Sequence, residues 1–314
     1  RGLGDVYKRQ VIISGAIETG ATVAYKNKSK RYPLVLLIMG TGTTDRDGNS
    51  RGFKTDFYKN LSDMFVNANC VCIRYDKRGT HQSTGNFKTC RLSDLVNDAA
   101  CVIDYARQLD FVDCEKIIVC GHSEGAMIAT LLTKSEKLCG IILLGGACMG
   151  LKEALLYQNY LVLGQAQNKK GVLGWYLRAV LTEDRLEKQV TKLFDKAQKS
   201  TKSRYFYNGA FFSTAYMKEH SALTGNDYAD MIKNFNGKVL AVTGKADVQA
   251  DYSRLDAVSQ FDNVTVYTPD NVNHVMRKTD SKNILGAKKE YKKTLKNDID
   301  KGVKYAILTW LDCL

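Results

Sequence analysis

The sequence contains no apolar run that is long enough to cross a lipid bilayer. Its longest nearly unbroken apolar stretch, residues 138–149, includes glycines and falls short of the roughly 20 residues that a membrane-spanning helix needs. Internal repeats and low-complexity linkers are also missing. The 314 residues, 44% hydrophobic and 25% charged, have the composition of a globular protein that buries a full-sized core.

Patterns for metal binding and disulfides are missing as well. The nine cysteines are odd in number, form no C-x-x-C pair, and often lie inside apolar runs. We expect them to be small core residues in a reducing compartment, which favours a cytoplasmic protein without disulfides. The four histidines include no pair at metal-ligand spacing, so we expect no metal site.

Positive charge is in excess, with a formal net charge of +13. The lysines are spread through helical segments with acidic residues between them, which is typical of a solvated surface. We therefore expect no nucleic-acid partner. Nucleic-acid binding through this charge is kept as an alternative, and it would be sensitive to salt.

The first ten residues, RGLGDVYKRQ, fit no periodic pattern. They resemble a translated sequencing adapter joined to an incomplete gene, so we expect residues 1–10 to be non-native and to lie outside the fold. Any true N-terminus, a signal peptide included, would then precede this sequence.

Strand-like and helix-like segments alternate along the first half of the chain. An antiparallel hairpin is expected over residues 11–25. Continuous apolar runs, typical of strands buried on both faces of a parallel sheet, follow at residues 34–39, 70–75, 116–120 and 138–144. Segments with helical spacing lie between these runs. The pattern predicts a doubly wound, mostly parallel α/β sheet with right-handed crossovers.

This alternation stops after Gly145 and resumes with an apolar run at residues 238–243. The segment between them is helical, aromatic and irregular. We therefore predict an α/β core formed by residues 11–145 and 237–314, with residues 146–236 inserted as a helical lid. The lid would lie at the carboxyl edge of the sheet, where ligands of such sheets bind.

Residues 121–125, GHSEG, fit the pattern G-x-S-x-G between a predicted strand and a predicted helix. In this context a serine is held on a sharp turn, and the glycines permit the close approach that the turn requires. Ser123 is therefore the predicted nucleophile, which needs a base to take its proton. The structural alternative is a glycine-rich helix entry with an incidental serine.

The acid and the base that would activate this serine are expected later in the chain, in that order. Asp247 follows the predicted strand 238–243, and His274 follows the next strand. Both should lie at the same sheet edge as Ser123. His274 is the predicted base and Asp247 the acid that orients it. Asp251 is an alternative acid, although its position suits a helix cap.

Two backbone amides are predicted to bind the oxyanion of an acyl-transfer transition state. One belongs to Glu124, the residue after the nucleophile, whose side chain is expected to be structural or on the surface. The other belongs to Thr41, where flanking glycines allow the amide to turn inward. The surrounding loop, residues 40–48, lacks the glycine and lysine spacing of nucleotide-binding loops, which argues against a nucleotide site.

Three motifs resemble the α/β-hydrolase superfamily and, within it, the bacterial dienelactone-hydrolase-like and serine-aminopeptidase-like esterases. They are MGTG with DRDG in residues 39–48, RYDKRG in residues 74–79, and GHSEG in residues 121–125. Members of that branch usually have His-Gly where this chain has Met39 and Gly40. The resemblance implies hydrolysis of a small-molecule ester or related acyl substrate through an acyl-enzyme, with no cofactor.

Other functions of the same scaffold stay open. An aminopeptidase, a thioesterase or an acyltransferase could use the same three side chains, and a binding protein with vestigial chemistry is a further alternative. An aminopeptidase would need lid carboxylates to hold an amine, and the candidates are Glu183, Asp184, Glu187 and Glu219. Apolar lid surface for an ester could come from Phe206, Tyr207, Phe211, Phe212 and Tyr216.

Overall fold

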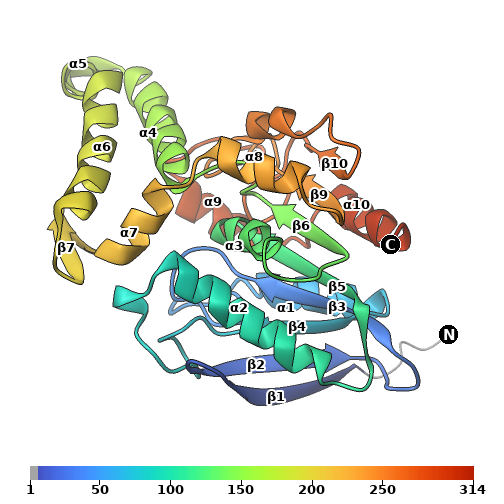
Figure 1. Ribbon diagram of the computed structural model, residues 1–314. Helices are drawn as coiled ribbons and strands as arrows, with labels where there is room; N and C mark the ends of the chain where they lie inside the picture. Colours follow the sequence, from blue (N-terminus) through green and yellow to red (C-terminus); the bar gives the residue numbers. More distant parts are fainter. Residues whose placement is uncertain (1–5) are drawn as a thin grey trace.

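The computed structural model describes residues 6–314 and is organised around one eight-stranded sheet (Figure 1). The strand order is β1-β2-β4-β3-β5-β6-β9-β10. The strands are β1 Tyr7–Ser14, β2 Glu18–Tyr25, β3 Tyr32–Ile38, β4 Val71–Tyr75, β5 Val112–His122, β6 Gly140–Leu144, β9 Lys238–Val242 and β10 Val264–Tyr267. From β4 to β10 all neighbours are parallel, which confirms the predicted doubly wound sheet.

The hairpin β1–β2 forms the antiparallel end of the sheet, and β2 pairs antiparallel with β4. It begins earlier than expected, because residues 7–10 pair with residues 22–25. These four residues, which we expected to lie outside the fold, are thus part of the sheet. The predicted non-native origin of residues 1–10 stays a prediction, and residues 1–5 lie outside the described residues.

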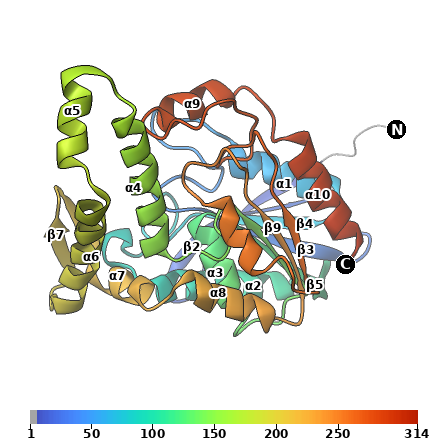
Figure 2. The same cartoon turned by 90° about the horizontal axis from the view of Figure 1, so that it is seen from above.

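Helices cover both faces of the sheet (Figures 1 and 2). One face carries α1 Phe57–Asn67 and α10 Lys301–Asp312, and the other carries α2 Leu92–Arg107, α3 Glu124–Leu132 and α8 Gly225–Lys233. Shorter helices are η1 Phe87–Thr89, η2 Tyr252–Ala257 and α9 Ala287–Thr294. No helix within residues 6–314 combines the length and the apolar character that a bilayer crossing requires.

Strand β3 shows why its sequence is a continuous apolar run. Leu34 and Leu36 belong to the core under α2 and α3, whereas Val35 and Leu37 belong to the core under α1 and α10. Successive side chains of a strand point to opposite faces, so a strand covered by helices on both faces needs apolar residues at every position.

The segment between β6 and β9 projects from one end of the sheet (Figure 1). Its elements are α4 Leu151–Gln167, α5 Gly171–Val180, α6 Glu183–Lys199, the hairpin β7 Arg204–Tyr207 and β8 Ala210–Ser213, and α7 Thr214–Ser221. Helix α8 follows but packs against α3 and η2, in the helical layer of the sheet. The projecting part of the predicted lid therefore lies between Leu151 and Ser221.

Helix α6 illustrates how the sequence builds this projecting part. Thr182 caps its first turn by accepting a hydrogen bond from the Arg185 amide. Its buried residues recur at helical spacing and pack against α4 and α7, and they are Leu186, Val190, Leu193, Phe194 and Ala197. Together with Tyr205 and Met217, most of them form a small apolar core that is separate from the cores of the sheet.

The turn from β5 into α3 brings two backbones into contact without intervening side chains. A Cβ atom placed on Gly125 would lie 2.1 Å from the carbonyl oxygen of Ile38, at the end of β3. A Cβ atom placed on Gly121 would lie 2.0 Å from the carbonyl oxygen of Gly125. Only glycine fits at either position, and α3 can therefore begin directly above the carboxyl end of β3.

We predict that Gly125→Ala lowers the free energy of unfolding by about 2 kcal/mol or more, because α3 must move away from β3. The matched control is Gly164→Ala in α4, where a Cβ atom would meet nothing within 4 Å. This control should raise the free energy of unfolding by up to about 1 kcal/mol. Urea unfolding followed by circular dichroism measures both, and equal stabilities of the two variants would contradict the packing described for the turn.

Candidate active site

Ser123 lies on the sharp turn between β5 and α3, with φ 56° and ψ −121°. A positive φ is uncommon for a residue with a side chain and marks a strained position. The Ser123 amide donates to the carbonyl of Leu144 at 2.8 Å, which ties the turn to β6. Two glycines leave room beside it, since a Cβ atom on Gly40 would lie 2.9 Å from the Ser123 Cβ, and one on Gly146 2.4 Å from the Ser123 carbonyl oxygen.

Asp247 and His274 meet on the loops that follow β9 and β10. The His274 Nδ1 lies 2.8 Å from Asp247 Oδ2, and both residues are buried. The other carboxylate oxygen, Oδ1, accepts from the amides of Gln249 and Ala250 at 2.7 and 3.0 Å. These amides hold the carboxylate, and an Nδ1–H donated to it would leave the Nε2 of His274 free to act as a base.

The alternative acid, Asp251, has a different partner. Its side chain accepts from the Ser253 amide at 3.0 Å and caps η2. The structure therefore brings Asp247 to His274, whereas Asp251 has the helix-capping position that its place in the sequence suggested.

Ser123, His274, Thr41 and Glu124 all line one cavity of about 410 Å³. Gly145 lies against the predicted base and acid, since a Cβ atom placed on it would lie 3.1 Å from His274 Nδ1 and 3.2 Å from Asp247 Oδ2. The hydrogen bonds of residues 6–314 join His274 to Asp247 but not to the Ser123 hydroxyl. Contacts between a nucleophile and its base often shorten only when substrate binds.

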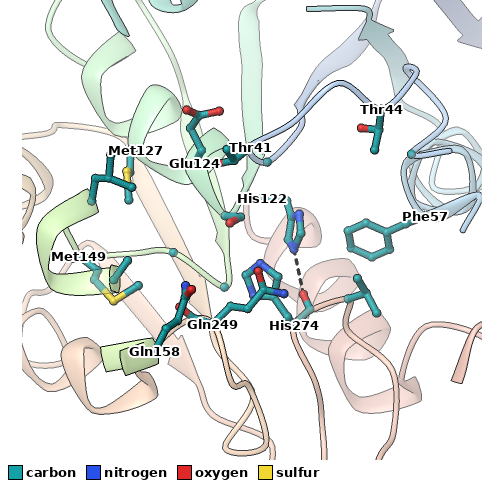
Figure 3. A pocket seen from close by; sticks show the side chains of 18 of the residues that line it. Thr41, Thr44, Phe57, His122, Glu124, Met127, Met149, Gln158, Gln249 and His274 are labelled. Carbon is teal, nitrogen blue, oxygen red and sulfur yellow. Dashed lines mark hydrogen bonds between the residues drawn. The ribbon is translucent and has the colours of Figure 1, made fainter. Parts of the chain in front are cut away.

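The two predicted oxyanion amides belong to residues that line the same cavity as Ser123. Glu124 is the first residue of α3, so its N–H has no acceptor within the helix and lies at the positive end of the helix dipole. Thr41 follows β3 and, like Glu124, lines the cavity (Figure 3). The loop before Thr41 is held by side chains, because Tyr58 Oη accepts from the Gly40 amide at 2.8 Å.

His122, the residue before the serine, links this loop to the predicted base. The Tyr58 hydroxyl oxygen accepts a hydrogen bond from the Gly40 amide, so the hydroxyl proton of Tyr58 can be donated to His122 Nδ1, which lies 2.9 Å away. The His122 Nε2 can then donate to the backbone oxygen of His274 at 2.8 Å (Figure 3). Burial first, and then the charge of His274, keep the pKa of His122 well below its usual value. A neutral imidazole suits this pair of bonds.

The Glu124 side chain is buried and points away from His122 and His274 (Figure 3). Its carboxylate pairs with Lys77 Nζ at 2.6 Å and accepts a hydrogen bond from the hydroxyl of Tyr216. Burial acts to raise the pKa of Glu124, but Lys77 and Tyr216 outweigh it and the pKa lies below the usual value. This side chain is thus structural, as one of our two alternatives held, and is not on the surface.

The projecting segment contributes a large part of the cavity wall. Helices α4 and α7 and the turn before them supply Met149, Leu151, Ala154, Leu155, Gln158, Tyr216 and His220. Of the five lid aromatics named from the sequence, Tyr216 lies at the cavity, whereas Phe206 and Phe211 are 52% and 61% exposed. Of these five candidates for an apolar substrate surface, the four on β7 and β8 are absent from the cavity lining and Tyr216 is part of it.

The roles of several residues of the site could not be assigned from the sequence. Tyr58 lies in a helix with ordinary amphipathic spacing, and Lys77 lies in a charged run that follows β4. Their roles depend on contacts with residues that are 18 to 64 positions away along the chain. Within residues 6–314, no group of three or more His, Cys, Asp or Glu side chains is arranged to hold a metal ion.

Comparisons with known proteins agree on the fold and the family. A curated relative, the esterase EstD of Thermotoga maritima, is 25% identical over 289 residues, which cover 89% of this chain and 62% of the esterase. The chain thus spans less than two thirds of the length of that relative. Among solved structures, Est1E from Butyrivibrio proteoclasticus with bound ferulic acid has a TM-score of 0.57 at 16% identity, covering 92% of this chain and 99% of the other.

The mouse alpha/beta hydrolase domain-containing protein 10 has a TM-score of 0.53 at 14% identity, covering 91% of this chain and 99% of the other. At these identities the solved structures show the α/β-hydrolase fold alone. The model of the family described as "Serine aminopeptidase, S33" matches residues 51–254, a range that includes Ser123 and Asp247 and ends before His274. Because this match spans more than half of the chain, the protein belongs to the serine aminopeptidase S33 family of α/β hydrolases.

Proposed function

We propose that this protein hydrolyses carboxylic esters, with Ser123 as nucleophile, His274 as base and Asp247 as the acid that orients the base. The observation that carries the proposal is the 2.8 Å contact between His274 Nδ1 and Asp247, beside a cavity that His274 shares with Ser123. The similarity to EstD, which is named an esterase, supports the proposal.

The reaction has two half-reactions. In the first, His274 Nε2 takes the Ser123 proton as Oγ bonds to the ester carbon, and the amides of Thr41 and Glu124 bind the oxyanion. The bond to the alcohol then breaks, and the alcohol leaves with the proton from Nε2. In the second half, a water molecule gives a proton to Nε2 and attacks the acyl-enzyme, which releases the acid and returns the proton to Ser123.

The charges around the cavity favour an ester over the amine-bearing substrate of an aminopeptidase. Among the described residues that line this cavity, Glu124 is the one with an acidic side chain, and both its oxygens are engaged by Lys77 and Tyr216. The carboxylates considered for amine binding lie outside the lining, and they are Glu183, Asp184, Glu187 and Glu219. An ammonium group would therefore lose its hydration without gaining a free carboxylate.

The apolar part of the cavity suits a short or medium acyl chain. It is lined by Met127 of α3 and by Met149, Leu151 and Leu155. Because α4 and α7 form this side of the cavity, we propose that residues 146–236 act as the lid that determines acyl preference. The cytoplasmic location and the lack of a nucleic-acid partner stay predictions.

The proposed reaction predicts turnover of p-nitrophenyl esters with short to medium acyl chains. Ser123→Ala removes the nucleophile and His274→Ala the base, so each should lower kcat by about 10⁴-fold or more. Asp247→Asn should lower kcat by about 10³-fold or more, because the acid that orients the base is lost. The matched control Asp251→Asn should stay within about twofold of the wild type. Efficient cleavage of aminoacyl anilides without ester cleavage would contradict the proposal.

A second prediction concerns acyl-chain length. Leu155→Trp fills part of the apolar wall, so the ratio of kcat/KM for an octanoyl ester to that for an acetyl ester should fall by about tenfold. The matched control is Leu161→Trp on the same helix, because Leu161 is not among the residues that line the cavity. If both variants change the ratio equally, the assignment of the acyl side to this wall is wrong.

A further inference from the structure

Lys77 is a buried lysine that the reaction described above does not use. Its side chain is 2% exposed, and its Nζ lies 2.5 Å from the carbonyl oxygen of Gly40 and 2.6 Å from Glu124 Oε2. Lysine is almost never fully buried unless it is paired, because removing the ammonium from water is costly. The two partners of Lys77 belong to the two loops that carry the predicted oxyanion amides.

The bond to Gly40 orients the amide of Thr41. The Gly40 oxygen and the Thr41 N–H belong to one peptide unit, and the chain has no cis peptide bond within residues 6–314. In a planar trans peptide the C=O and the N–H point in opposite directions. An ammonium that holds the oxygen on the buried side therefore turns the Thr41 N–H toward the other side, where Thr41 lines the cavity.

The charge of Lys77 acts on the same peptide unit. A cation at the carbonyl oxygen draws electron density away from the nitrogen and makes the N–H a stronger donor. The preceding amide, that of Gly40, is held separately by Tyr58. The loop before Thr41 is thus fixed at both polar atoms of Gly40.

The bond to Glu124 connects the second amide to this arrangement. Lys77 holds the side chain of the residue whose backbone N–H is the other predicted oxyanion donor. The remaining Glu124 oxygen accepts from Tyr216 on α7, and α7 also supplies part of the cavity wall. The projecting segment is therefore joined to the oxyanion site through Glu124 and Lys77.

We propose that Lys77 is a positioning residue for the oxyanion hole, aiming and polarising the Thr41 amide through the Gly40 carbonyl. The inference rests on the proposed ester hydrolysis. A purely structural ion pair would stabilise the loops equally in the free enzyme and in the transition state. The proposed role of Lys77 instead stabilises the transition state more than the bound substrate.

The test removes the pair without leaving a lone buried charge. The double variant Lys77→Met/Glu124→Gln keeps side chains of similar length, and the oxygen of the introduced amide can still accept from Tyr216. The matched control is Arg78→Met/Asp98→Asn, which removes the neighbouring pair in which Arg78 Nε and Nη2 lie 2.9 and 2.7 Å from the Asp98 carboxylate. Melting temperatures of all proteins are measured alongside the kinetics.

For the Lys77 double variant we expect kcat for a p-nitrophenyl ester to fall about 10- to 100-fold, with KM within about threefold, because the loss is confined to the transition state. The Ki of an alkyl trifluoromethyl ketone, which forms an oxyanion on the serine, should rise by the same factor. The control pair should change kcat and Ki by less than about threefold, whatever its effect on melting temperature.

A Lys77 double variant that is folded and has wild-type kcat and Ki overturns the inference, as does an equal loss in the control pair. If the double variant does not fold, Lys77→Arg is the deciding variant. It keeps the buried positive charge but replaces the compact ammonium with a planar guanidinium. It should lower kcat at least about fivefold with unchanged KM, and a wild-type kcat overturns the inference. The outcomes for the Lys77 variants leave the proposed function intact. That function is overturned if the wild-type protein is inactive on every ester.

Discussion

The whole account depends on one backbone constraint, the sharp turn that carries Ser123 from β5 into α3. The turn exists because Gly121 and Gly125 allow the strand end, the helix start and β3 to approach within distances that no side chain would permit. This approach puts the serine at the positive end of α3 and beside the loop after β3. The parallel sheet then delivers Asp247 and His274 from its other strands to the same edge.

Around this turn, buried polar contacts accompany the apolar packing. Tyr58 and His122 connect the Gly40 amide to the backbone of His274, and Lys77 connects the Gly40 carbonyl to Glu124. Such contacts are costly to bury unless every partner is in place, so they favour one arrangement of the loops over others. A preorganised arrangement of this kind stabilises developing charge better than one that must form during the reaction.

Most of the fold could be predicted from the sequence, because runs buried on both faces and amphipathic helices leave periodic patterns. The positions of Ser123, Asp247 and His274 followed from one motif and from the order of the strands. The side-chain network could not be predicted, since Tyr58 and His122 meet across 64 positions and Tyr216 and Glu124 across 92. Residues 7–10 were misjudged for a related reason: their pairing with β2 depends on the partner strand, not on a pattern of their own.

The central claim is that Ser123 is a nucleophile activated by His274, and covalent labelling tests it most directly. The protein is treated with a fluorophosphonate probe, and the adduct is located by intact-mass measurement and peptide mapping. The account predicts one adduct per chain, on Ser123, formed far more slowly in His274→Ala than in the wild type. An unlabelled protein, or an adduct on another residue that forms equally fast in His274→Ala, would contradict it.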